Sequence, residues 1–235
     1  MTKRAENFVI NESNLIYEDD DLIAFDKPAG LPSQPTLDPN RANLYGLAKI
    51  YLGNRPGAGH DIYLGMHHRL DVGTSGVVLF TKRKDVNKWI SDRFRSRQVL
   101  KTYLALVSLP DQSDISSEPW RITSYLKKVK EGPKGAAISK TVRSGGQVAT
   151  TDFRVIRIFE REALIEARPL TGRMHQIRVH LAEQGLPILG DLLYRLKDQI
   201  PSRLMLHAYQ LELESNTGKN IKVEAKLPPE FEKLV

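Results

Sequence analysis

Stretches with the residue pattern of β-strands outnumber helical stretches in this chain, and the two kinds do not alternate regularly. Apolar and β-branched runs predict strands over 22–26, 76–80, 102–107, 152–159 and 163–167, and a hairpin that joins 204–213 to 220–225. Three segments carry the apolar stripe of a helix: 43–53, 85–95 and 174–184. Without strict strand–helix alternation, an α+β fold on a mainly antiparallel sheet is favoured over a doubly wound fold.

The chain is basic, and its positive residues are clustered. The formal net charge is +7 over 235 residues. One basic stretch lies over 82–101 and a second over 127–143, where Glu131 is the acidic residue. Clustered positive charge favours a polyanionic partner such as nucleic acid.

Several classes of chemistry are disfavoured by what the sequence lacks. There are no cysteines, which excludes thiolate catalysis, thiolate metal sites and disulfides. The histidines do not have a chelating spacing, so no metal site is predicted, and no glycine-rich phosphate loop implies a nucleotide cofactor. Residues 1–21 hold no apolar run suited to a signal peptide or a membrane span. The sequence therefore predicts a cytoplasmic protein with no cofactor and no membrane contact.

The densest polar cluster covers 66–76, directly before a predicted strand. It contains two histidines, an arginine, a carboxylate and two hydroxyls: His67, His68, Arg69, Asp71, Thr74 and Ser75. Functional residues are frequent on such loops. On local sequence alone, the commoner reading is structural, with Asp71 organising an Asx turn ahead of Gly73.

A second cluster covers 168–180. If Thr171 caps the following helix, Arg173 lies in the first turn, where the helix dipole disfavours a cation unless an anion is also present. This hints at a phosphate or carboxylate partner. Helical spacing would place His175 and Arg178 on one face. The alternative is a solvated basic helix.

Taken together, these segments match an ordered set of motifs. The motifs are 17–21 and Lys27-Pro28-Ala29-Gly30, then His68-Arg69-Leu70-Asp71 with Thr74-Ser75-Gly76, then Lys101 and Tyr103, then the run from Thr171 to His180, then Gly190-Asp191 and Leu206-His207-Ala208. In this order they closely resemble the RluA family of pseudouridine synthases. The resemblance covers most of the chain.

The resemblance implies a fold, a substrate and a set of site residues. It implies a central antiparallel sheet in two lobes flanked by helices, with RNA in the cleft between them and the target uridine flipped into it. The family's catalytic carboxylate falls on Asp71, its active-site tyrosine on Tyr103 and the arginine paired with the carboxylate on Arg178, with Arg173 as the competing arginine. The resemblance also suggests substrate-binding roles for a further set: His68, Arg69, Thr74, Arg173, His175 and Gln176.

Two departures from the family pattern are visible. Many relatives carry a small S4-type RNA-binding module, whereas here the catalytic pattern begins by Tyr17, so 1–235 is expected to form a single catalytic domain. RNA choice would then rest on this domain's own loops. After Tyr194 the family pattern leads us to expect glycine, and Arg195 stands there instead.

The implied reaction needs no redox group or group donor. The bond from uracil N1 to ribose breaks, the base turns, and C5 joins C1′. A carboxylate can attack C6 or C1′, or can remove a ribose proton, and the sequence leaves these routes open. A guanidinium within about 4 to 6 Å would favour the ionised carboxylate. Tyr103 offers a ring to stack on uracil, although a core aromatic on a buried strand is the plainer reading.

The expected substrate is a stem-loop of ribosomal or transfer RNA, bound by a monomer, because flipping a base costs least where the RNA is unpaired. Two rival functions remain: a catalytically idle RNA-binding or ribosome-assembly protein of the same fold, and an N-glycosidase that stops at bond cleavage. The segment 127–147, with glycines among its lysines, is interpreted as a mobile hairpin or loop that clamps RNA backbone, or as a solvated surface loop.

Overall fold

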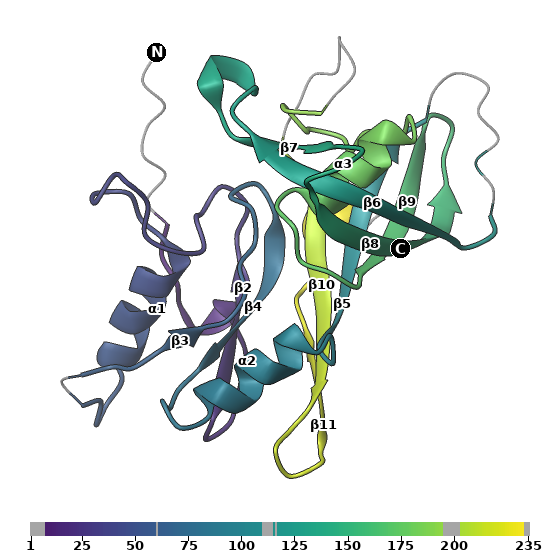
Figure 1. Ribbon diagram of the computed structural model, residues 1–235. Coiled ribbons are helices and arrows are strands. Elements are labelled where there is room, and N and C mark those ends of the chain that lie inside the picture. The colour runs from purple at the N-terminus through teal and green to yellow at the C-terminus, as the bar shows by residue number, and fades with distance from the viewer. Residues whose placement is uncertain (1–7, 60, 110–114, 116, 195–202, 233–235) are drawn as a thin grey trace.

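The computed structural model describes residues 8–59, 61–109, 115, 117–194 and 203–232 (Figure 1). Arg195, where the family pattern leads us to expect glycine, lies outside the described residues. Within this part of the chain, no helix is both long and apolar enough to cross a lipid bilayer.

The described strands form one mixed sheet of eleven strands, which run in the order β1-β2-β4-β10-β5-β9-β8-β6-β7, with β11 paired to β10 and β3 to β4. The strands are β1 (Leu15–Glu18), β2 (Leu22–Lys27), β3 (Gly65–Met66), β4 (Ser75–Thr81), β5 (Leu100–Ser108), β6 (Trp120–Val129), β7 (Ile138–Thr141), β8 (Gln147–Ile158), β9 (Glu162–Pro169), β10 (Leu206–Glu214) and β11 (Asn220–Glu224). The helices are α1 (Leu44–Gly53), α2 (Asn87–Arg95), α3 (Gln176–Glu183) and α4 (Pro229–Glu232), and the 3₁₀ turns are η1 (Glu12–Asn14) and η2 (Pro133–Gly135). The strand pairs are antiparallel apart from β4–β10, which confirms the predicted α+β fold on a mainly antiparallel sheet.

The half of the sheet that contains β2 and β4 is covered on both faces. Ile23 and Phe25 of β2 belong to the core that holds Leu44 and Ala48 of α1. The alternate residues Leu22 and Ala24 belong to a second core with Ile90 of α2. Because side chains alternate along a strand, the two helices cover opposite faces, and this explains why 22–26 is apolar throughout. The Asn43 side chain accepts the Gly46 N–H at 3.0 Å and begins α1 where the sequence predicted.

The other half contains β5, β9, β8, β6 and β7, with α3 against them (Figure 1). Trp120 is the first residue of β6 and stacks on Phe153 with ring centroids 5.3 Å apart. The predicted hairpin over 127–147 is confirmed in part, because β6 and β7 pair with Lys127 opposite Lys140. Figure 1 shows this β6–β7 hairpin projecting from the body of its half. Its mobility and its contact with RNA stay predictions.

The two halves meet at the parallel pair β4–β10, where His207 lies opposite Ser75 and Ala208 opposite Gly76. Gly76 has φ +114°, and a Cβ there would lie 2.1 Å from the Ala208 carbonyl oxygen, so glycine is required for this close approach. The Ser75 hydroxyl and His207 Nδ1, 2.9 Å apart, form a hydrogen bond across the same pair. This junction fixes the chain immediately after the loop that carries Asp71.

Candidate active site

The loop that carries Asp71 is held by hydrogen bonds to Lys27, at the end of β2, and to Ser33 in the segment that follows. The fully buried Lys27 ammonium donates to the carbonyl oxygens of Leu31 at 2.7 Å and Val72 at 3.3 Å. The Ser33 hydroxyl accepts the Leu70 N–H at 3.0 Å. The loop closes on itself through the Thr74 N–H and the Asp71 backbone oxygen, 3.1 Å apart. The Asp71 carboxylate is thereby directed away from its own turn.

Burial lowers the pKa of Lys27 from its ordinary 10.5 to about 7, an effect partly opposed by the charges of Asp71 and Asp26. Between about pH 7 and 10.5 the unfolded chain therefore binds more protons than the folded one, and the Lys27 contribution to the free energy of unfolding rises with pH. We expect the stability of the wild type relative to Lys27→Met to increase between these limits, as measured by urea unfolding at several pH values. A difference in the free energy of unfolding between the two proteins that stays constant or falls with pH contradicts this. Lys219→Met, at an exposed turn, serves as the control.

Arg178 of α3 lies between two carboxylates. Its Nη1 donates to Asp71 Oδ2 at 3.1 Å. Its Nε and Nη2 form a two-pronged pair with Asp191 Oδ2 at 2.7 Å and Oδ1 at 2.8 Å. The Asp191 side chain is fully buried and that of Arg178 is 8 % exposed, whereas Asp71 is 24 % exposed. Asp191 therefore anchors the guanidinium, and Asp71 is the carboxylate left accessible.

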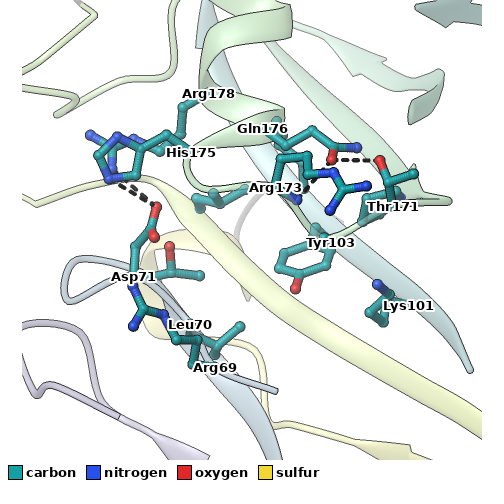
Figure 2. A pocket seen from close by; sticks show the side chains of 15 residues that line it. Arg69, Leu70, Asp71, Lys101, Tyr103, Thr171, Arg173, His175, Gln176 and Arg178 are labelled. Atoms are coloured by element: carbon teal, nitrogen blue, oxygen red, sulfur yellow. Dashed lines mark hydrogen bonds and ion pairs between the residues drawn. The ribbon is translucent and has the colours of Figure 1, made fainter. Parts of the chain in front are cut away.

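His175 also faces Asp71, with Nε2 3.8 Å from Oδ2 (Figure 2). The residue precedes α3 in the left-handed conformation with φ +56°. Its other ring nitrogen, Nδ1, lies 3.0 Å from the Tyr194 hydroxyl. Burial lowers the pKa of His175, Asp71 opposes this shift, and Arg178 adds to it. A neutral imidazole is therefore the favoured form beside the Asp71–Arg178 pair.

Asp71, Tyr103 and Arg178 line one pocket of about 100 Å³ together with Arg69, Thr74, Arg173, His175 and Gln176. The residues come from the Asp71 loop, from β5 and from the segment 169–178 (Figure 2). Tyr103 packs against the cores of both halves and stays partly exposed. Burial, and then the Asp71 charge, raise the pKa of its phenol, so the ring is a neutral face at the pocket wall.

Two of the residues with predicted substrate contacts, His68 and Gln176, form hydrogen bonds with other parts of the chain. His68 is outside the pocket lining: its Nε2 accepts the Leu79 N–H at 2.9 Å, its ring stacks on Phe94, and burial lowers its pKa to about 3. Gln176 lines the pocket, but its amide oxygen accepts from the Thr171 hydroxyl at 2.7 Å and the Arg173 N–H at 3.0 Å. Both side chains thus organise backbone in this structure.

The start of α3 differs from the sequence expectation. Thr171 is not the helix cap, because the helix begins at Gln176 and Arg173 lies in the preceding turn. The Gln176 amide group holds this turn through Thr171 and Arg173 and also donates to the Thr150 carbonyl at 2.9 Å. The argument from the helix dipole for an anion near Arg173 is therefore wrong. The Arg173 side chain donates to the Val148 carbonyl at 3.0 Å and remains at the pocket mouth.

Comparison with known proteins assigns the chain to a family. A family model described as RNA pseudouridylate synthase matches residues 21–183, well over half of the sequence. The chain belongs to the RNA pseudouridylate synthase family. Members of this family isomerise uridine to pseudouridine in RNA, and this membership confirms the resemblance to RluA-type enzymes.

Relatives of this pseudouridine synthase match most of its length. The ribosomal large subunit pseudouridine synthase C of Rickettsia felis is 35 % identical over 225 residues, covering 93 % of this chain and 69 % of the relative. The ribosomal large subunit pseudouridine synthase D of Borreliella burgdorferi is 31 % identical, with 92 % and 66 % covered. The solved structure of human RNA pseudouridylate synthase domain containing 4 is 28 % identical with a TM-score of 0.73, covering 93 % of this chain and 90 % of that one.

Sequence reasoning assigned no role to Asp191 or Tyr194 of this pseudouridine synthase. Gly190-Asp191 stood among the motifs, but nothing in the local pattern connects it with Arg178 thirteen residues earlier. Asp191 follows a turn that requires glycine: Gly190 has φ +73°, and a Cβ there would lie 1.6 Å from the Arg203 carbonyl oxygen. This turn places the Asp191 carboxylate beside Arg178. The buried acid that follows such a glycine is the signal that points to an internal partner.

Proposed function

We propose that this chain isomerises specific uridines in structured ribosomal RNA, transfer RNA or both, with Asp71 as the catalytic carboxylate and without a cofactor. The observation that carries the proposal is the partly exposed Asp71 carboxylate, held at 3.1 Å by Arg178 in the wall of a pocket that also contains Tyr103. A carboxylate so placed can act on a base that enters the pocket, as nucleophile or as base.

Each neighbour of Asp71 supports a step that the reaction needs. Arg178 places positive charge beside the carboxylate, which disfavours its protonation when a bound base excludes water. The neutral Tyr103 ring offers a stacking face for a flipped uracil. A detached uracil must turn before C5 joins C1′, and a pocket walled by β5 and the segment 169–178 would confine it while it turns.

A groove of about 500 Å³ continues from the pocket and supports RNA as the substrate. Lys101, Gly172 and Arg173 line both spaces. The positive residues of the groove are Arg95, Arg97, Lys101, Arg168 and Arg173, against the acids Asp152 and Glu212. Nucleotides that flank the target uridine would follow this groove, where guanidinium groups can pair with their phosphates. The two bacterial relatives are named for the large ribosomal subunit, which favours ribosomal RNA for this chain.

A map of pseudouridines in total RNA from cells with and without the gene tests the function. We expect one or more positions to lose pseudouridine on deletion and to regain it with the wild-type gene. A catalytically idle RNA-binding protein would leave the map unchanged. An N-glycosidase would release free uracil, whereas isomerisation releases nothing and leaves the RNA mass unchanged.

The β6–β7 hairpin provides a separate prediction about RNA affinity. Lys127, Lys128 and Lys130 are exposed on it. Their joint replacement by alanine should weaken RNA binding and flatten the slope of log K against log salt by up to about 2 to 3 units, because each phosphate contact releases counterions. The slope is measured by titrating a labelled stem-loop at several salt concentrations.

The matched control changes Lys219 and Lys222 to alanine, since both are exposed and lie on the remote β10–β11 hairpin. The control should keep the wild-type slope. An unchanged slope in the triple variant would remove the hairpin from the RNA interface and leave the pocket and groove as the contact surface.

A further inference from the structure

The Tyr194 hydroxyl lies at a junction of three polar atoms. It accepts the Ser139 N–H at 2.7 Å, is placed to donate to the Ser139 carbonyl oxygen at 3.0 Å, and lies 3.0 Å from His175 Nδ1. The ring beneath this hydroxyl packs against the Arg178 guanidinium, 5.2 Å from its centroid. Tyr194 thus contacts both groups that face Asp71, without reaching Asp71 itself.

The hydroxyl has a single proton to donate, and two acceptors compete for it. The pKa of Tyr194 is raised by burial to about 12, so the phenol keeps this proton at neutral pH. Since the Ser139 N–H can only donate, the phenol proton goes either to the Ser139 carbonyl oxygen or to His175 Nδ1. The choice determines which ring nitrogen of a neutral His175 carries hydrogen.

The charge on Asp71 favours the arrangement in which Tyr194 donates to His175 Nδ1. If Nδ1 carried the hydrogen, the Nε2 lone pair would face Asp71 Oδ2 at 3.8 Å, and two centres of negative charge would oppose each other. If Tyr194 donates to Nδ1, the hydrogen lies on Nε2 and points to the carboxylate. The second arrangement replaces this repulsion beside a full negative charge by an attraction, and it gives up the hydrogen bond from the phenol to the Ser139 carbonyl oxygen.

We propose that Tyr194 is a positioning residue whose hydroxyl holds His175 as the Nε2–H tautomer, so that Asp71 is faced by an imidazole N–H as well as by the Arg178 guanidinium. The tautomer is inferred from these contacts and from the Asp71 charge, and it does not depend on the proposed function. Its consequence for the rate rests on the proposed function, in which Asp71 performs the chemistry.

The same hydroxyl connects this arrangement to the β6–β7 hairpin. Ser139 is a buried residue of β7, and its side-chain hydroxyl donates to the Met174 carbonyl at 2.6 Å, one residue before His175. Tyr194 and Ser139 therefore tie the base of the hairpin to the backbone and the ring of His175. A hairpin that is displaced from this position would take away the Ser139 N–H donor and the Ser139 carbonyl acceptor that lie at the phenol.

Nuclear magnetic resonance of the histidine ring nitrogens identifies the tautomer of His175 directly. In ¹⁵N-labelled protein, the long-range ¹H–¹⁵N pattern distinguishes Nε2–H from Nδ1–H, and the signals of His175 are assigned by their loss in His175→Gln. We expect the Nε2–H form in the wild type and a mixture of tautomers in Tyr194→Phe, which keeps the ring and removes the hydroxyl. The Nδ1–H form in the wild type would overturn the proposal, whether or not the Phe variant folds.

Single-turnover kinetics on a stem-loop test the consequence for the reaction. Tyr194→Phe should slow pseudouridine formation at saturating RNA on the order of tenfold, the effect of a small misplacement of a functional group, while the RNA dissociation constant stays unchanged. The control Thr141→Val removes another contact between β7 and α3, the 2.7 Å hydrogen bond from Thr141 to Glu183, and should change neither tautomer nor rate.

The outcomes distinguish the positioning role of Tyr194 from the proposed function. A changed tautomer with an unchanged rate overturns the positioning role of Tyr194. Wild-type protein that forms no pseudouridine on any RNA refutes the proposed function, and the resonance measurement still decides whether the hydroxyl sets the tautomer.

Discussion

Asp71→Asn should abolish pseudouridine formation while the protein still folds and binds RNA. Asparagine matches the shape of aspartate and can accept the Arg178 Nη1–H that now lies 3.1 Å from Oδ2. It cannot serve as a nucleophile or a base, so we expect the single-turnover rate to fall by at least about 10³-fold. The rate is scored as pseudouridine after nuclease digestion of RNA from a deletion strain, with bound RNA measured in parallel.

The structural reading of Asp71 predicts a different result. Asparagine is nearly as good as aspartate in an Asx turn, so a residue needed only for the loop would tolerate the change. The loop itself is held by Lys27 and Ser33 rather than by the carboxylate. Substantial product from a folded Asp71→Asn protein would refute Asp71 as the catalytic carboxylate.

Arg178→Met should lower both the activity and the stability. Activity should drop by at least about 10²-fold, because Asp71 loses the charged donor that favours its ionised form. Stability should fall by about 3 to 5 kcal/mol, because the fully buried Asp191 loses its two-pronged partner. Urea unfolding measures the second effect and single-turnover kinetics at low temperature the first.

A double variant separates these two effects. Arg178→Met with Asp191→Asn leaves no unpaired buried charge, so part of the lost stability should return while activity stays low. Recovery of activity together with stability would show that Arg178 acts through the fold alone. Arg173→Met is the matched control, since Arg173 binds the Val148 carbonyl at the pocket mouth and should affect RNA affinity more than chemistry.

Sequence reasoning found β2 because both faces of this strand are buried. Ile23 and Phe25 face one helix, Leu22 and Ala24 the other, and such runs are apolar throughout. In contrast, β6 was not predicted, because it alternates exposed residues such as Arg121 and Thr123 with partly buried ones. Its extended conformation is stabilised by pairing with β8. Its polar pattern resembles that of a loop until the partner strand is known.

The site residues likewise depend on contacts between residues that lie far apart in the sequence. The motif resemblance brought Asp71 and Arg178 together although they are 107 residues apart, but local spacing could not choose between Arg178 and Arg173. The choice depends on where α3 begins, and that is set by the Gln176 amide bonding to Thr171 and to β8. The role of Asp191 depends on a turn that the sequence marks by a glycine alone.

The parallel junction between β4 and β10 also governs when the site can exist during synthesis. Ser75 and His207 are 132 residues apart, and the strand that follows the Asp71 loop has its partner only when β10 has reached β4. Contacts of such long range form late in folding, because the intervening chain must first be closed into a loop. A ribosome that is still translating this chain therefore exposes the basic segments 82–101 and 127–143 before it has made an assembled Asp71–Arg178 pair. The nascent protein therefore carries charge that attracts RNA before its site is assembled.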